Sequence, residues 1–255
     1  MNGIDCVFHL AAFSRIQIAM KNPDACIDVN YVGTNNLLKC SVEAGVKRFI
    51  NSSTSSSYGL ANIPPLREDM PTDCLNPYSA SKVGAEILCQ MYQKLHGLST
   101  VTLRYFNVYG LRQPLKGHYA PVIGLFEEQK KARKPCTIVG DGEQRRDFTH
   151  VLDVVEANMC AMQTNHNGVF NIGTGKNHSV NDIAKKSKDY SRLGGIVSTA
   201  RLFVNFENEK RDHENIMQDK TNDQEMVDLA QKDLKELIGN KEKYESELKL
   251  FLLPK

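Results

Sequence analysis

The chain has 255 residues, of which 41% are hydrophobic and 24% are charged, and its formal net charge is +2. These values are ordinary for a globular protein with a sizeable core, and they give no reason to expect nucleic acid or an anionic membrane as a partner. No run of about 18 apolar residues predicts a membrane-spanning helix. The N-terminus lacks the basic region and the long apolar segment of a secretory signal. We therefore expect a cytoplasmic protein.

Charge is distributed unevenly along the chain. Of the first 185 residues 35 are charged, whereas 27 of the remaining 70 are. All seven cysteines lie in the first part, without the spacing of a metal site, so we expect reduced thiols and no metal centre. The change in composition predicts two domains, residues 1–184 and residues 185–255.

Patterns of strand and helix alternate through the first domain. In chain order they predict a strand at 6–12, a helix at 24–44, a strand at 48–50 that runs into 51–57, a helix at 78–96, a strand at 100–105, a strand near 136–139, a helix at 151–162 and a strand at 168–172. This alternation predicts an α/β fold, in which helices cover a parallel sheet.

Three of the predicted strands end in segments that suit a binding site. These segments are His9-Leu-Ala-Ala12, Ser52-Ser53-Thr54 and Tyr105-Phe-Asn107. Each segment alone is typical of loop capping. Because open α/β sheets bind ligands beyond the carboxyl ends of their strands, the three together predict a site on one rim of the sheet.

The strongest chemical signal is Tyr78-Ser-Ala-Ser-Lys82. A Tyr and a Lys four residues apart share one face of a helix, and we expect the ammonium to lower the pKa of the phenol, ordinarily about 10. The pair can then take a proton from a sugar hydroxyl as hydride leaves its carbon. This spacing also arises by chance as a surface contact. The hydroxyl of Thr54 strengthens the hypothesis, because it can bind the reacting hydroxyl and pass its proton to Tyr78.

Residues 1 to about 183 resemble the extended short-chain dehydrogenase/reductase family, in its NAD-dependent epimerase/dehydratase branch, and above all UDP-glucose 4-epimerase-like proteins. The segments that carry the resemblance are 9–12, 30–38, 52–59, 76–82, 103–110, 139–148 and 171–175. The resemblance implies an incomplete Rossmann-type parallel sheet with flanking helices. It also implies a homodimer through helices 24–44 and 78–96.

The resemblance implies a role for each matching residue. Tyr78 is the catalytic base, Lys82 holds the nicotinamide ribose, and Thr54 supplies the catalytic hydroxyl. The residues that line the NAD pocket are Leu10, Ala11, Ala12, Asn30, Ser52 and Tyr105. Asn107 and Arg146 hold the substrate diphosphate, for which the planar donors of arginine are well suited. Without the resemblance, Arg146 and its neighbour would be interpreted as a solvated basic pair.

The reaction implied by the resemblance starts from a UDP-sugar. NAD takes a hydride from the sugar C4, and it returns the hydride to the opposite face of a 4-keto intermediate. Dehydratases of the family usually place an acid pair beside the catalytic hydroxyl, whereas Thr54 is followed by three serines. This difference favours epimerisation, while the identity of the sugar stays open. We expect Asp147 to have a structural role in orienting its loop.

The sequence contains no glycine-rich G-x-x-G-x-x-G loop and no acidic residue for the adenosine ribose. Its first strand resembles the fourth strand of the family's sheet, so we expect an N-terminally truncated chain with an exposed apolar strand edge. Because backbone N–H groups of the missing loop would anchor the pyrophosphate, we also expect weak NAD binding and impaired activity.

The second domain has a different character. Its helical periodicity predicts an antiparallel hairpin of two helices at about 188–219 and 223–252. Residues 186–255 resemble the N-terminal helical domain of class-I peptide-chain release factors, without their catalytic Gly-Gly-Gln loop. This resemblance leaves an alternative to the enzyme, namely a non-catalytic helical interaction protein, associated with the ribosome, or a chimeric gene product.

Overall fold

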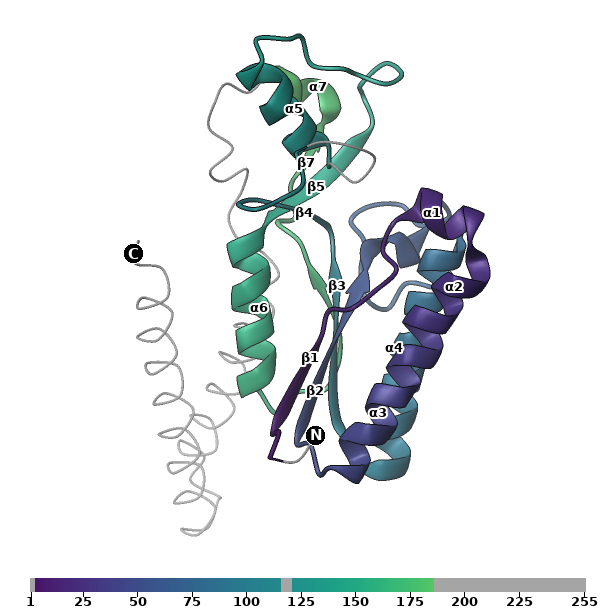
Figure 1. Ribbon diagram of the computed structural model, residues 1–255. Helices are drawn as coiled ribbons and strands as arrows, with labels where there is room; N and C mark the ends of the chain where they lie inside the picture. The colour runs from purple at the N-terminus through teal and green to yellow at the C-terminus, as the bar shows by residue number, and fades with distance from the viewer. Residues whose placement is uncertain (1–2, 116–120, 186–255) are drawn as a thin grey trace, which may run out of the picture. The chain divides into compact units, whose positions relative to one another are not determined.

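The computed structural model describes residues 3–115 and 121–185, all within one compact unit of the chain (Figure 1). Strands and helices alternate along these residues, and the helices flank a parallel sheet. The predicted α/β fold of Rossmann type is therefore confirmed. The predicted helical hairpin lies outside the described residues, and the boundary at residue 185 stays a prediction.

The main sheet has four parallel strands in the order β1-β2-β3-β6. They are β1 (Cys6–His9), β2 (Arg48–Thr54), β3 (Ser99–Tyr105) and β6 (Gly168–Ile172). Thr54 pairs with Tyr105, which in turn pairs with Ile172, so three strands reach the same rim. Within the described residues β1 is an edge strand, and Phe8 on it is 38% exposed. The expectation of a truncated chain with an exposed apolar strand edge stays a prediction.

Helices cover the two faces of this sheet (Figure 1). Helices α3 (Gly33–Glu43) and α4 (Pro77–His96) pack on one face, and α6 (Val151–Gln163) packs on the other. Successive side chains of β2 point to opposite faces, so Phe49 contacts α3 and α4 while Ile50 contacts α6. Burial of each such side chain stabilises the fold by about 1.5–3 kcal/mol.

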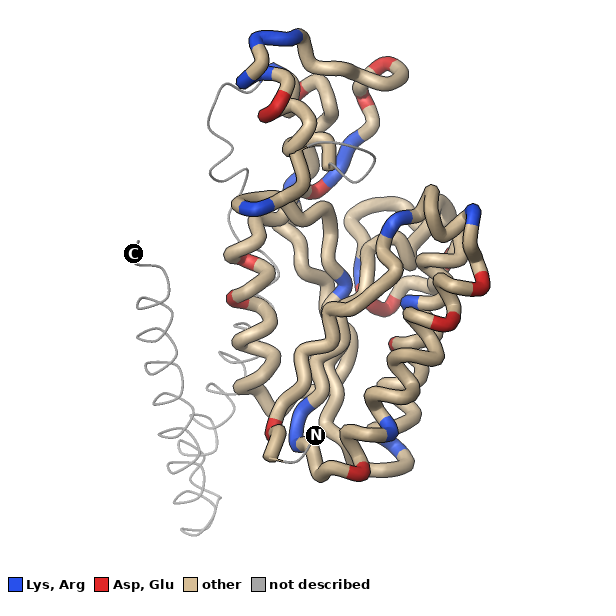
Figure 2. Tube along the Cα trace, viewed as in Figure 1, with Lys and Arg blue, Asp and Glu red and all other residues tan. Residues whose placement is uncertain are grey.

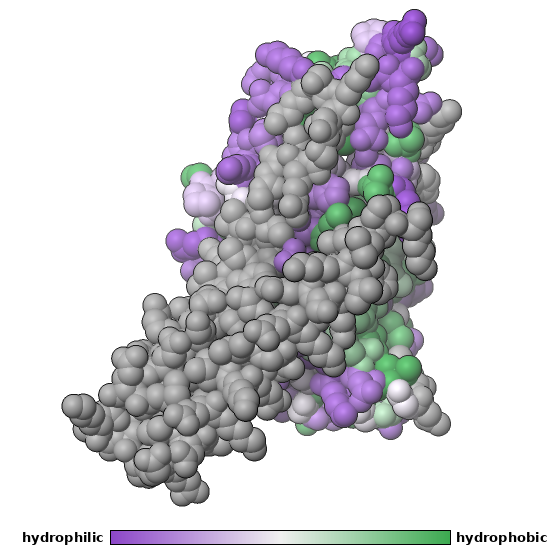
Figure 3. Space-filling view, turned by 90° about the vertical axis from the view of Figure 1, so that its left-hand side faces the viewer, coloured by the Kyte–Doolittle hydropathy of each residue, from purple (hydrophilic) through white to green (hydrophobic). Residues whose placement is uncertain are grey.

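A second, smaller sheet is adjacent to the main one. Its strands are β4 (Asn107–Tyr109), β5 (Arg145–His150) and β7 (Asn177–Ser179), of which β4 and β5 are parallel and β5 and β7 antiparallel. Helices α5 (Val122–Lys131) and α7 (Val180–Lys185) enclose a separate apolar cluster with it. On the face in Figure 3 hydrophilic side chains predominate around this sheet, and hydrophobic ones gather lower down, level with the main sheet.

The structure corrects several predicted elements. Residues 136–139 form no strand, because Ile138 and Val139 are exposed and no neighbouring strand pairs with them. Residues 145–150 instead form a strand. Its two arginines break the apolar pattern by which a strand is recognised in a sequence. The predicted helix at 24–44 is divided into α2 (Pro23–Ile27), the π-helix η1 (Asp28–Val32) and α3. The first strand ends at His9, and the short helix α1 (Ile16–Lys21) follows its loop.

Three further findings concern cysteines, metal sites and membrane-spanning helices among the described residues. All seven cysteines are free thiols. Groups of three or more His, Cys, Asp or Glu side chains suited to a metal ion do not occur in residues 3–115 and 121–185. In that same part of the chain, no helix combines the length and the apolarity needed to cross a membrane.

A glycine turn connects the end of β2 to the segment before α4. After Thr54 the chain forms the 3₁₀-helix η2 (Ser55–Tyr58), which ends at Gly59 with φ +57° and ψ −140°. Few residues other than glycine adopt this region. A Cβ at Gly59 would lie 2.1 Å from the carbonyl oxygen of Asp73. The Asp73 carboxylate also accepts hydrogen bonds from the next two backbone N–H groups, at 2.8 and 2.9 Å.

We predict that Gly59→Ala lowers the free energy of unfolding by at least about 2 kcal/mol, since it combines a strained backbone with a steric overlap. Urea denaturation measures the loss. Gly45→Ala is the matched control, because Gly45 has φ +67° but open space around its Cα. We expect the control to cost only about 1 kcal/mol. Equal losses for the two variants would contradict the steric explanation.

Candidate active site

The candidate site lies where β2 ends and α4 begins. Asn76 caps α4, and its Oδ1 accepts a hydrogen bond from the backbone N of Ser79 at 2.9 Å. Pro77 occupies the first helical position, where a proline costs nothing. Tyr78 is thus in the first turn, and Thr54 is near enough to influence the ionisation of its phenol. Two of the predicted catalytic side chains are together.

Thr54 is held by the turn that follows it. Its Oγ1 accepts a hydrogen bond from the backbone N of Ser56 at 3.1 Å, and its carbonyl accepts one from Ser57 Oγ at 2.9 Å. The backbone therefore fixes the Thr54 side chain while its own O–H remains free to donate toward Tyr78. The serines that follow Thr54 are used in building this turn.

Burial dominates the ionisation of Tyr78. Desolvation raises the pKa of the phenol, and the nearby Thr54 side chain and the charge of Arg15 only partly oppose it. The expectation that Lys82 lowers this pKa is therefore wrong in its direction. The physical reason is that a phenolate loses more hydration in this position than its neighbours replace.

Lys82 follows Tyr78 by one helical turn, and its side chain is 2% exposed. Its Nζ has no hydrogen-bond partner among the described residues. Burial lowers the pKa of Lys82 from 10.5 to about 8, against the attraction of Cys89, Glu86 and Cys26. A buried ammonium without a partner is costly, so the site is suited to a ligand that supplies oxygen acceptors at this point.

Asn30 fastens the loop after β1 to α4. This side chain is fully buried in the π-helix η1. It accepts a hydrogen bond from Phe13 N at 2.7 Å, and its Nδ2 donates to Phe13 O at 3.2 Å and to Ser81 Oγ at 3.0 Å. The preceding residues 10–12 thereby lie in a fixed loop, in which Leu10 is exposed. A π-helix at such a position is common in functional sites.

His9 belongs to the same region, although the sequence analysis assigns it no role of its own. The hydroxyl of Thr34 donates to Asn30 O at 2.6 Å, so His9 Nε2 is the donor in its 2.8 Å contact with Thr34. Burial, with the charge of Lys82, lowers the pKa of His9 to about 4. His9 is consequently neutral near pH 7. An isolated histidine at the end of an apolar strand is the sequence signal for it.

Ser52 and Tyr105 meet on the α6 side of the sheet. Tyr105 Oη lies 3.1 Å from Ser52 Oγ and 2.7 Å from Asn158 Nδ2, which donates to it. Asn158 itself is fixed through a 2.7 Å hydrogen bond to Val154 O. Burial raises the pKa of Tyr105. The structure therefore groups these two predicted NAD-binding residues with each other and adds Asn158, which the sequence analysis missed.

Asn107 and Arg146 lie on the neighbouring strands β4 and β5. Asn107 Nδ2 donates to Asp147 O at 2.9 Å, and the exposed Arg146 donates through Nη1 to Arg145 O at 2.7 Å. The Asp147 carboxylate accepts three hydrogen bonds, from Thr174 N, Thr174 Oγ1 and Gly175 N, at 2.7–3.0 Å. The expected structural role of Asp147 is thus confirmed.

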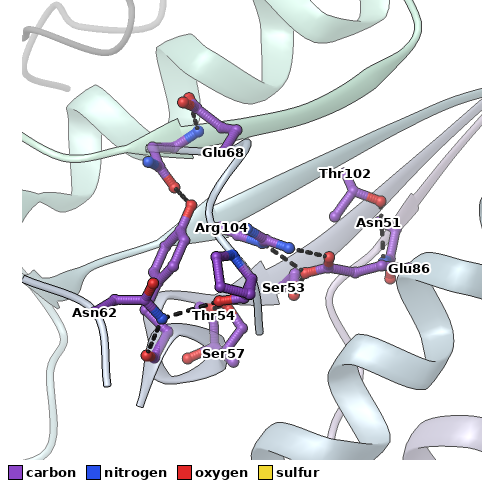
Figure 4. A network of polar contacts seen from close by, with 12 residues as sticks. Asn51, Ser53, Thr54, Ser57, Asn62, Glu68, Glu86, Thr102 and Arg104 are labelled. Atoms are coloured by element: carbon purple, nitrogen blue, oxygen red, sulfur yellow. Dashed lines mark hydrogen bonds and ion pairs between the residues drawn. The ribbon is translucent and has the colours of Figure 1, made fainter. Parts of the chain in front are cut away.

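A buried ion pair lies beside the site, and the sequence did not predict it. Arg104 on β3 bonds Glu86 on α4 through Nε at 3.0 Å and Nη2 at 2.7 Å (Figure 4). Ser53 Oγ donates to the same carboxylate. Along the strands of the main sheet only Arg48 and Arg104 are charged (Figure 2). A charged residue within such a strand requires a partner, and this is the signal that could have revealed the pair.

Comparison with known proteins shows the family to which this chain belongs. The sequence model of the family described as GDP-mannose 4,6 dehydratase matches residues 1–250. The chain belongs to this family. Its members include NAD-dependent epimerases and dehydratases, which are enzymes. The resemblance of residues 186–255 to release factors stays a prediction.

Several members of the family are close relatives. UDP-glucuronate 4-epimerase of Thermodesulfobacterium geofontis is 38% identical over 184 residues, which are 71% of this chain and 55% of the relative. UDP-glucose 4-epimerase from Thermotoga maritima, solved with UDP-glucose, has a TM-score of 0.69 at 39% identity over 71% of this chain and 59% of its own. The Thermus thermophilus enzyme, solved with NAD, has a TM-score of 0.65 at 32% identity over 71% and 60%. The chain thus spans somewhat over half the length of these relatives.

We predict that Lys82→Met raises the free energy of unfolding by about 2 kcal/mol near neutral pH, since it removes a buried charge. In the unmodified chain the penalty is complete below pH 8 and disappears as the pH rises toward 10.5, because the folded state then binds fewer protons than the unfolded state. Urea denaturation measures the free energy of unfolding of both proteins. The difference in favour of Lys82→Met should be smaller at about pH 9.5 than at about pH 7.

Lys39→Met is the control for this substitution, because the Lys39 side chain is 67% exposed on α3. We expect its effect to stay within about 0.5 kcal/mol at both pH values. A Lys82→Met variant that is no more stable than the unmodified chain near neutral pH would contradict the burial argument.

Proposed function

We propose that residues 1–184 carry the catalytic centre of an NAD-dependent epimerase that acts at C4 of a UDP-sugar. The observation that carries this proposal is the unpartnered, buried Nζ of Lys82, one turn after Tyr78, whose phenol lies near Thr54. The family of the chain and the UDP-sugar 4-epimerases among its relatives support it.

The residues present fit NAD. The ammonium of Lys82 is suited to donate to the hydroxyl oxygens of the nicotinamide ribose, which would satisfy its missing hydrogen bonds. We assign the lining of the pocket to Leu10, Ala11, Ala12, Asn30, Ser52 and Tyr105. When bound, NAD supplies the hydride acceptor and donor for the sugar C4.

Within this proposal Tyr78 is the general base. Burial raises the pKa of Tyr78 and lowers that of Lys82 to about 8, so both shifts disfavour the charged forms, the phenolate and the ammonium. The phenolate can take the proton of the sugar hydroxyl only when a bound ligand offsets this cost of burial. The Thr54 hydroxyl donates toward the phenol oxygen and orients the reacting hydroxyl beside it.

The surroundings of Thr54 favour epimerisation over dehydration. The three serines after Thr54 build η2, and Glu86, the carboxylate in the buried part of α4, is held by Arg104. On the neighbouring sheet we assign Asn107 and the exposed Arg146 to the substrate diphosphate. The choice among nucleotide sugars is left open.

A homodimer is part of the proposal. The outer surfaces of α2, η1 and α4 expose the large apolar residues Ile27, Val32, Ile87, Met91 and Leu95. Gly84 lets α4 approach the ring of Tyr31, because a Cβ there would lie 2.7 Å from that ring. These surfaces are suited to pair with their copies in a four-helix bundle. The free thiols fit a cytoplasmic location.

The alternative, a ribosome-associated or chimeric protein, depends on residues 185–255. It stays a prediction, and no observation on the described residues favours it.

We predict that Tyr78→Phe lowers turnover of UDP-galactose to UDP-glucose, at saturating NAD, by at least about 100-fold, because the general base is lost. Tyr92→Phe is the matched control. Its hydroxyl lies on the same helix but contacts Asn35 at 3.1 Å, and we expect unchanged turnover. Full activity of Tyr78→Phe, or no turnover of any UDP-sugar by the unmodified chain, would count against the proposed function.

We predict that Ile87→Glu and Leu95→Glu each convert the dimer to a monomer, since a buried unpaired carboxylate opposes association. Light scattering during size-exclusion chromatography measures the mass. Leu111→Glu, at an apolar residue that is exposed outside these helices, serves as the control and should remain dimeric. A monomeric unmodified chain would refute this part of the proposal.

A further inference from the structure

The two halves of α4 contact the sheet in different ways. Toward its C-terminus, Leu88, Cys89 and Tyr92 pack in an apolar cluster with Phe49 of β2, and Thr100 Oγ1 of β3 lies 3.3 Å from Cys89 O, a long hydrogen bond. Apolar packing is non-directional, so it does not by itself fix how far the helix slides or turns on the sheet. Nearer the N-terminus, where Tyr78 and Lys82 lie, the buried carboxylate of Glu86 makes a shorter, charged contact with the sheet.

The geometry of that contact is specific. Arg104 presents two N–H groups to the two oxygens of Glu86, at 3.0 and 2.7 Å, and both side chains are almost completely buried. Ser53 and Arg104 are paired residues of β2 and β3, so they act from one face of the sheet. Figure 4 shows Ser53, Arg104 and Glu86 directed toward one another. Such a bidentate pair fixes both the distance and the direction of its partners.

The same arginine also reaches the turn that holds Thr54. Its Cζ lies 4.8 Å from the ring centroid of Tyr58, the last residue of η2. Tyr58 Oη donates to Asn171 Oδ1 at 2.7 Å, and Asn171 N donates to Glu68 Oε1 at 2.8 Å. Arg104 therefore contacts both α4, which carries Tyr78, and η2, whose N-cap is Thr54.

We propose that Glu86 and Arg104 are positioning residues, whose ion pair sets α4 against η2 so that Tyr78 and Lys82 face Thr54. This inference rests on the proposed function, which gives those three residues their catalytic meaning. Glu86 follows Lys82 by four residues and lies about 40° from it around the helix axis. A displaced Glu86 would therefore displace Lys82 with it.

The charge of Glu86 provides a second link to Lys82. The titratable groups that face Lys82 are His9 on β1, Cys26 on α2, and Glu86 and Cys89 on its own helix. The attraction of Glu86 opposes the burial that lowers the pKa of Lys82. Neutral glutamine at this position would remove that attraction and leave the Arg104 guanidinium uncompensated, and both changes lower the pKa of Lys82 further.

The experiment uses the full chain with ¹³C-labelled lysine and tyrosine side chains, followed by NMR across a pH titration. Lys82→Met and Tyr78→Phe assign the two resonances. In Glu86→Gln we expect the titration midpoint of Lys82 to fall by at least about 0.5 pH unit, and the Tyr78 resonance to move. Arg104→Lys keeps the positive charge but loses the bidentate contact with Glu86. In this variant the Tyr78 resonance should move as well.

Glu43→Gln is the matched control, since Glu43 pairs with Lys39 at 3.9 Å across one turn of α3 on the surface. It should change neither signal. A folded Glu86→Gln chain with both signals unchanged would overturn the proposal. If that variant does not fold, the double variant Glu86→Met/Arg104→Met replaces the buried pair by apolar side chains of similar size. An unmoved Tyr78 resonance there would overturn it equally.

These measurements need neither NAD nor a sugar. Lack of turnover in the unmodified chain would therefore refute the proposed function and leave the positioning result standing. If the unmodified chain is active but Glu86→Gln leaves both resonances unchanged, the positioning proposal is refuted and the proposed function stands.

Discussion

One energetic constraint shapes the candidate site, namely the costly burial of the Lys82 ammonium on α4. A charged group without hydrogen-bond partners loses several kcal/mol of hydration in such a place. The surroundings reduce this cost in two ways. The thiols of Cys89 and Cys26 oppose the lowering of its pKa, and so does the carboxylate of Glu86, which lies one turn farther along the same helix.

The neighbours of Lys82 follow from the same constraint. His9 remains neutral, because burial and the adjacent ammonium lower its pKa to about 4. The amide of Asn30 is hydrogen-bonded to Phe13 and Ser81, which joins the loop after β1 to the residue before Lys82. The helix that carries Lys82 is in turn fixed at Asn76 by a cap and at Glu86 by Arg104. Several secondary-structure elements are thus arranged around one unsatisfied nitrogen.

Much of this arrangement is visible in local sequence patterns. The apolar runs and helical periodicities predict β2, α4, β3, α6 and β6 close to their observed bounds. Elements without such a pattern escape prediction. Strand β5 begins with two exposed arginines, and only its later residues Phe148 and Thr149 are buried. Residues 136–139 have the β-branched composition of a strand but no neighbour to pair with.

The sequence by itself determined the order of the strands and helices and placed Tyr78 and Lys82 on one helical face, because the helical period relates residues a few positions apart. Only the tertiary structure decided which groups are buried and what they meet. It reversed the expected direction of the Tyr78 pKa, because desolvation depends on every element packed around the phenol. It also joined Glu86 to Arg104 across 18 positions and Tyr58 to Asn171 across 113. Such pairs depend on strand order and register, which no local pattern specifies.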